Sequence, residues 1–110
     1  MTVRMSKPWA SLSRENIAGL GAHMGVYEVQ DSSEHTVFIG YAGGKSLFGL
    51  RGELERELGR LGTGHRFRCE VNTQYMTRYK ELLMVHQADL GELPRDNRDS
   101  APRLGRLRPE

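Results

Sequence analysis

One acidic side chain, Glu81, stands among basic neighbours in a stretch with the apolar spacing of a helix. It is the only carboxylate in the first turns of that predicted helix, and Arg78 and Lys80 lie close to it. A lone carboxylate can hold a divalent cation such as Mg²⁺, and adjacent cations can bind phosphate. The alternative is a surface glutamate that pairs with Arg78 or Lys80. Both interpretations stay open on these residues alone.

Two short runs of β-branched and aromatic residues, Gly25–Val29 and Thr36–Gly40, flank the polar turn Gln30–His35. This composition predicts a β-hairpin. A loop with two glycines, Ala42–Lys45, follows, and the next predicted helix carries Arg51 near its start. Arginine suits phosphate binding because its planar guanidinium can donate two parallel hydrogen bonds. Its alternative role is a surface ion pair on the helix.

This order of hairpin, loop and arginine-bearing helix resembles the signature of the GIY-YIG nuclease superfamily, written here as GVY and FIG. The resemblance covers roughly residues 24–97. It implies an α+β fold with a small, mostly antiparallel three-stranded sheet flanked by helices. It also implies that Arg51 binds phosphate, that Glu81 binds a metal ion and that Asn97 is the asparagine of the family. The signature positions are Gly25, Val26, Tyr27, Phe38, Ile39 and Gly40.

The activity that this resemblance implies is a metal-dependent endonuclease that hydrolyses phosphodiester bonds in DNA, or alternatively in RNA. The implied cofactor is Mg²⁺ or Mn²⁺. In such an enzyme Tyr27 would assist proton transfer, Arg51 would neutralise charge on the phosphoryl oxygens and Glu81 would hold the metal. Tyr27 has the alternative role of a core aromatic residue with a partnered hydroxyl.

Phe38 departs from the signature because it lacks the hydroxyl of the second tyrosine. Tyr41 could supply a hydroxyl, but three residues further along a regular strand it points to the opposite face. Arg51 follows Gly40 by eleven residues, about three more than is usual in the family, and Lys45 in the lengthened loop competes with it for the site. A second function therefore stays open: a catalytically inactive module of the same fold that binds nucleic acid or a protein partner.

Periodicity predicts the elements that must position these residues. In chain order they are a helix over 11–20, strands over 25–30 and 36–41, a helix from 46 or 50 to 61, a strand over 65–72 and a helix over 74–89. Ser13 and Thr73 are the expected N-caps of the first and last helices. The expected fold class is therefore α+β.

The predicted helix that ends at residue 61 has two distinct faces. Its apolar face consists of Leu47, Leu50, Leu54, Leu58 and Leu61, which recur at three- and four-residue steps. Its charged face consists of Arg51, Glu53, Glu55, Arg56, Glu57 and Arg60. Charges at this spacing form ion pairs along a helix surface.

The 110 residues are expected to form one domain over 11–94, with an extension over 1–10 and a flexible, arginine-rich tail over 95–110. A net charge of +2 is too small to identify a nucleic-acid-binding protein by itself. Cys69 is the only cysteine and is expected to be a buried thiol in a reducing cytoplasm. No apolar run is long enough to span a membrane. The expected partners are nucleic acid, DNA in preference to RNA, and a protein that supplies specificity.

Overall fold

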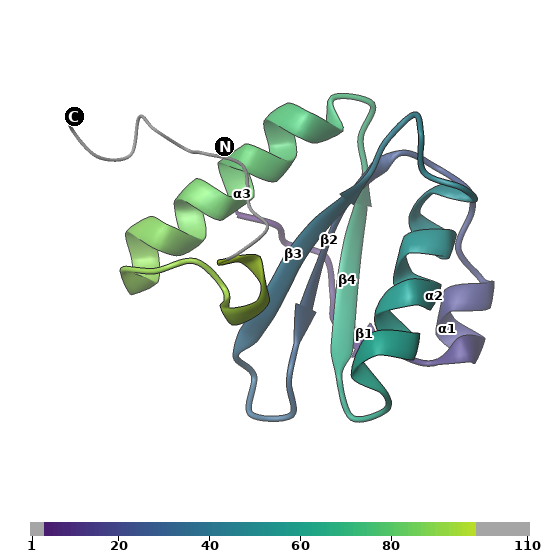
Figure 1. The fold of residues 1–110 in the computed structure, drawn as a ribbon, viewed down its shortest axis with the longest axis horizontal. Helices are drawn as coiled ribbons and strands as arrows, with labels where there is room; N and C mark the ends of the chain where they lie inside the picture. Colours follow the sequence, from purple (N-terminus) through teal and green to yellow (C-terminus); the bar gives the residue numbers. More distant parts are fainter. Residues whose placement is uncertain (1–3, 99–110) are drawn as a thin grey trace.

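The computed structural model describes residues 4–98. In chain order the elements are β1 (Ala10–Ser11), α1 (Arg14–Ala18), β2 (Gly25–Gln30), β3 (Thr36–Ala42), α2 (Gly49–Leu61), β4 (Arg66–Val71), α3 (Tyr75–Leu90) and the 3₁₀ helix η1 (Arg95–Asn97). Helices and antiparallel strands combine in an α+β fold, which confirms the expected class (Figure 1). No helix in this part of the chain has the length and apolar character needed to cross a membrane.

The strands form one antiparallel sheet in the order β1-β4-β2-β3. The GVY strand, β2, therefore lies between its two longest neighbours. The sheet has four strands where the sequence predicts three, because β1 adds Ala10 and Ser11 opposite Phe67 and Arg66. A strand of two residues is too short to show the period-two pattern by which strands are recognised in a sequence.

The helices cover both faces of the sheet: α1 and α2 pack on one face and α3 packs on the other (Figure 1). Consecutive strand residues point to opposite faces, so Tyr27 faces α2 while Val26 faces α3. The core on the α1 and α2 side consists of Leu12, Ile17, Tyr27, Val29, Val37, Ala42, Leu50, Leu54 and Phe67. The core on the α3 side consists of Met5, Val26, Ile39, Tyr79, Leu82 and Leu83.

The start of α2 differs from the apolar pattern of the sequence. Leu50 is buried as expected, but Leu47 is 75% exposed, so its predicted place on the apolar face is wrong. The reason is that Phe48 adopts a left-handed conformation with φ 64° and the helix begins only at Gly49. A Cβ on Gly49 would lie 2.5 Å from the carbonyl carbon of Ala22. This close approach fixes where the loop ends and the helix starts.

The two predicted N-caps have different outcomes. Ser13 is confirmed as the cap of α1, since its hydroxyl accepts a hydrogen bond of 3.3 Å from the amide of Asn16. Thr73 is not the cap of α3: the capping position is Gln74, which makes no side-chain capping bond. The side-chain oxygen of Asn72 accepts from the Gln74 amide at 2.8 Å instead. This neighbouring amide oxygen replaces the predicted threonine cap.

Residues from both ends of the described chain pack into the domain. Met5 is buried in the core on the α3 side. Asn97 is fully buried in η1, where its Oδ1 accepts from the Ile39 amide at 2.7 Å and its Nδ2 donates to the Ile39 carbonyl at 2.8 Å. The predicted extension and tail therefore contribute contacts to the fold at these two points. Residues 99–110 of the predicted tail lie outside the described residues.

Replacement of Asn97 by Ala is expected to lower the free energy of unfolding by about 2–4 kcal/mol, because the amide and carbonyl of Ile39 both lose their buried partner. Urea denaturation measures this change. The matched control is Arg98→Ala, which removes a half-exposed side chain from the next position and should cost less than about 1 kcal/mol. Equal stabilities of the Asn97→Ala variant and the wild type would contradict the role of Asn97.

Candidate binding cleft

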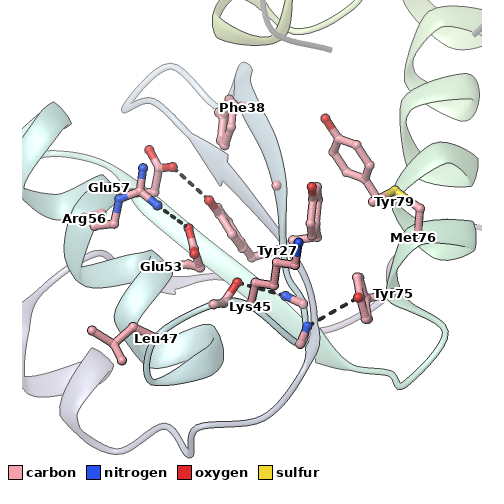
Figure 2. Close-up of a pocket in the computed structure, with 15 residues that line it drawn as sticks. Tyr27, Phe38, Lys45, Leu47, Glu53, Arg56, Glu57, Tyr75, Met76 and Tyr79 are labelled. Atoms are coloured by element: carbon pink, nitrogen blue, oxygen red, sulfur yellow. Dashed lines mark hydrogen bonds and ion pairs between the residues drawn. The ribbon is translucent and has the colours of Figure 1, made fainter. Parts of the chain in front are cut away.

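An open cleft lies around the C-terminal half of β3, between α2 and α3 (Figure 2). Its volume is about 790 Å³, which is within the usual range of ligand-binding sites. Its walls come from β2, β3, the loop before α2, and both helices. Residues that define these walls are Tyr27, Lys45, Glu53, Glu57, Tyr75 and Tyr79.

Tyr27 lies on the α2 side of the cleft and is 2% exposed. Its hydroxyl donates a hydrogen bond of 2.8 Å to Oε2 of Glu57, as Figure 2 shows. Burial, and then the adjacent Glu57 carboxylate, raise the pKa of the Tyr27 phenol well above its ordinary value of 10.0. Tyr27 therefore keeps its proton at neutral pH and holds it in a bond to Glu57.

Gly40 makes room for the Tyr27 ring. The two residues are directly opposite in the β2–β3 register. A Cβ on Gly40 would lie 2.4 Å from the hydroxyl oxygen of Tyr27, so any other residue would displace the ring. Phe38 lies on the same side, with its ring centroid 6.0 Å from that of Tyr27. The second signature position thus adds an apolar ring to this wall and no hydroxyl.

The α2 wall of the cleft carries paired charges. Glu53 accepts a hydrogen bond of 2.9 Å from Arg56. Glu57 is buried, and its second oxygen accepts from Arg60 at 2.6 Å. Arg60 also donates to Asp96 at 3.0 Å, which connects α2 to η1. Two carboxylates, both neutralised by neighbouring guanidinium groups, therefore line the helix that follows the FIG strand.

The α3 wall consists of aromatic rings. Tyr41 points toward α3, as the alternation of a regular strand predicts. Its ring stacks on Tyr75 with centroids 5.7 Å apart and meets Tyr79 at 4.8 Å. Burial raises the pKa of the Tyr79 phenol above its ordinary value. Because Tyr41 faces α3 while Phe38 faces α2, its hydroxyl does not take the place of the missing one.

The glycine loop is tied down by side chains. The amide of Gly43 donates to the Ser46 hydroxyl at 2.9 Å, and the amide of Gly44 donates to the Tyr75 hydroxyl at 3.3 Å. A Cβ on Gly43 would lie 2.7 Å from the Tyr75 ring, so the loop packs closely on α3. Lys45 is exposed at the tip of this loop and lines the cleft. The loop thus holds a lysine at the rim, and the amides of Gly43 and Gly44 already have partners.

Arg51 and Glu81 do not line the cleft with Tyr27. The guanidinium of Arg51 lies over the ring of Phe48, 5.7 Å from its centroid. Glu81 is 42% exposed, and its Oε1 is 2.6 Å from Nη1 of Arg78. This ion pair with Arg78 is the alternative to metal binding that the sequence left open for Glu81. The structure therefore separates the three residues that the resemblance nominates for catalysis.

A divalent cation at Glu81, which the resemblance implies, would share this carboxylate with Arg78. The carboxylate oxygen nearest to Arg78 already accepts a short charge-assisted hydrogen bond, and Arg78 also binds the Glu70 carboxylate at 2.9 Å. Within residues 4–98, His, Cys, Asp and Glu side chains form no group of three or more that could hold a metal ion. We assign no chemical step to a metal here.

Sequence reasoning missed the residues that form most of the cleft. Glu53 and Glu57 are four residues apart, as are Tyr75 and Tyr79, so each pair lies on one face of its helix. The sequence could not show that α2 and α3 border the same edge of the sheet. Only the strand order, with β3 at that edge, brings the two pairs together.

Comparison with known families gives one match. The family model described as Domain of unknown function (DUF7508) matches residues 3–89. No curated protein and no solved structure matches the chain. The matched range includes β2, β3, α2 and β4 and nearly all of α3, and thus the whole lining of the cleft.

Replacement of Tyr27 by Phe is expected to lower the free energy of unfolding at pH 7 by about 2 kcal/mol, since it removes a buried hydrogen bond to a charged group. The raised phenol pKa makes a second contribution, which is present below pH 10 and is lost as pH rises through the pKa of the folded state. The wild type should therefore lose stability above about pH 10, and Tyr27→Phe should lose less.

Urea denaturation at a series of pH values measures both effects. The matched control is Tyr41→Phe, which removes a hydroxyl from a ring that is 36% exposed and should change stability at pH 7 by less than about 0.5 kcal/mol. An identical alkaline loss in wild type and Tyr27→Phe would show that the buried phenol is not its source.

Proposed function

The chain belongs to the family described as Domain of unknown function (DUF7508), and we propose that it is a catalytically inactive GIY-YIG-like module that binds a partner in the cleft. The GVY and FIG runs support the fold part of this proposal, because they lie on the paired strands β2 and β3. Arg51 and Glu81 lie on α2 and α3, the helices that the resemblance assigns to them. The partner is nucleic acid or a protein.

The single observation that carries the inactive assignment is the α2 wall of the cleft. A phosphodiesterase needs a cation there to neutralise charge that develops on the phosphoryl oxygens. Glu53 and Glu57 line this wall, and Glu57 already accepts the Tyr27 proton donor. Both carboxylates already accept hydrogen bonds from guanidinium groups, and Arg51, the phosphate ligand that the resemblance implies, does not line the cleft.

The second candidate function is a Mg²⁺- or Mn²⁺-dependent endonuclease that acts on DNA or RNA. The observation that favours it is the agreement of element order: hairpin, helix with Arg51, third strand, helix with Glu81 and then Asn97. In that case the side chains of α2 and α3 would have to rearrange on substrate binding. For either function we place the protein in the cytoplasm, since its only cysteine, Cys69, is unpaired.

A nicking assay on supercoiled plasmid distinguishes these functions. Wild type with Mg²⁺ or Mn²⁺ is expected to leave the plasmid uncut, as are matched preparations of Arg51→Ala and Glu81→Ala, because neither Arg51 nor Glu81 lines the cleft. Circular dichroism of the three proteins checks that each is folded.

Nicking by the wild type that both substitutions abolish would overturn the inactive assignment and establish the endonuclease. Equal nicking by all three proteins would indicate a contaminating nuclease, and the comparison would be repeated after further purification. A gel-shift series with plasmid fragments at increasing salt tests the nucleic-acid partner separately, since phosphate contacts weaken steeply with salt.

A further inference from the structure

We propose that the partner is a protein, which contributes an extended segment that pairs with the open edge of β3 at Tyr41. The segment carries an apolar side chain for the tyrosine wall and an acidic side chain for Lys45. This inference rests on the proposed binding function of the cleft and names the class of partner.

The first evidence is the direction of the backbone groups of β3. Both the amide and the carbonyl of Ile39 bind the side chain of Asn97, so both point away from β2. Backbone groups alternate along an antiparallel strand, and the register from Ile39 to Tyr41 is regular. The amide and carbonyl of Tyr41 therefore also point away from β2, at the outer edge of the sheet.

These outward groups of Tyr41 lie where the cleft is open. Within residues 4–98, no backbone hydrogen bond from a turn, loop or cap reaches Tyr41. At Ile39 the side chain of Asn97 makes the two hydrogen bonds that a neighbouring strand would make. No residue of the described chain makes such bonds at Tyr41. A backbone amide and carbonyl without partners on an edge strand can bind an added strand.

The second evidence is the chemistry of the walls. Leu47 is 75% exposed at the rim of the cleft, and Met76 and Tyr41 are each 36% exposed across from it. Exposed tyrosine and methionine are typical of protein interfaces. An apolar side chain of an added strand would find Tyr41 and Met76 on the α3 side of the cleft, and Leu47 offers apolar surface at the opposite rim (Figure 2).

The charges of the cleft favour an acidic segment over a nucleic acid. Glu53 pairs with Arg56, and Glu57 pairs with Arg60. Lys45 has no ion pair in the described part of the chain, so it is the cation that remains for a ligand. One lysine can bind one carboxylate, whereas a nucleic-acid strand presents a phosphate at every nucleotide and would need several cations in a row.

The exposed ring of Phe48 extends the apolar surface beside Leu47. Phe48 is 54% exposed, and its left-handed backbone is unfavourable for a residue other than glycine. The guanidinium of Arg51 lies over its ring. A strained residue with an exposed aromatic side chain is consistent with a surface that is kept for contact.

The test is selection of short random peptides displayed on phage against the full-length wild type. Selected peptides are expected to combine an acidic residue with a nearby leucine or aromatic residue. Lys45→Glu should weaken their binding about tenfold, and exchange of the acidic peptide residue for lysine should restore it. Lys80→Glu is the matched control, because it makes the same charge change at an exposed position on α3 that does not line the cleft.

A second measurement addresses strand pairing itself. Methylation of the one peptide amide that faces the Tyr41 carbonyl should weaken binding, and methylation of either neighbouring amide should not, since successive amides of an added strand point in opposite directions. Isothermal titration with the synthetic peptides gives the affinities. Equal effects at neighbouring amides would overturn strand addition even if the peptides bind in the cleft.

The other outcomes also decide the proposal. Selection of basic peptides, or of no peptide whose binding Lys45→Glu weakens, would overturn it. Competition by a single-stranded oligonucleotide at the cleft would assign the partner to nucleic acids, and a concentration-dependent dimer that Lys45→Glu dissociates would assign it to a second copy. Metal-dependent nicking, in contrast, would overturn the inactive assignment and leave the peptide result to be judged by itself.

Discussion

The hydrogen bond between Tyr27 and Glu57 joins the centre of the sheet to α2, and the rest of the architecture depends on it. Glu57 also accepts a hydrogen bond from Arg60, and Arg60 donates a second one to Asp96 in η1. The side chain of the next residue, Asn97, binds the backbone of Ile39 in the sheet. The interactions thus form a closed circuit around the α2 side of the cleft, and a buried carboxylate is tolerated because each of its oxygens has a donor.

The same circuit defines what the cleft can bind. A carboxylate that holds a phenol and a guanidinium has little capacity left for a metal ion or a substrate proton. The opposite wall is aromatic and uncharged, and between the two walls lies the edge of β3. The cleft thus combines an α2 wall whose carboxylates already have hydrogen-bond donors with an apolar rim and unpaired backbone groups. These are features that protein-recognition sites share.

The sequence predicted most elements and few of the contacts. The hairpin, the third long strand and the two long helices follow from alternation and from three- and four-residue spacing, because these signals are local. The periodicity places Leu47 on the apolar face of the helix. This is wrong because Phe48, in a left-handed conformation, separates Leu47 from the helix. Asn97 could be recognised only through a family resemblance, since its two hydrogen bonds reach a strand 58 residues away.

The distribution of the site residues could not be read from the sequence for a similar reason. Arg51 and Glu81 stand at suitable places along the chain, yet the rotation of each helix about its axis decides which residues face the cleft. That rotation depends on Leu50 and Leu54 in α2 and on Leu82 and Leu83 in α3, which must enter the two cores. Packing thus presents Glu53 and Glu57 to the cleft and leaves Arg51 outside its lining.

The late position of Asn97 has a consequence for the synthesis of the chain. When residues 36–42 leave the ribosome, the outer backbone groups of Ile39 have no partner, and they stay open until residue 97 has been made. During that interval the edge of β3 can pair with other chains, as unprotected edges do. Protection of this edge therefore waits for η1, which follows every strand in the chain. One asparagine then closes the edge at Ile39 and leaves the backbone groups of Tyr41 for another strand.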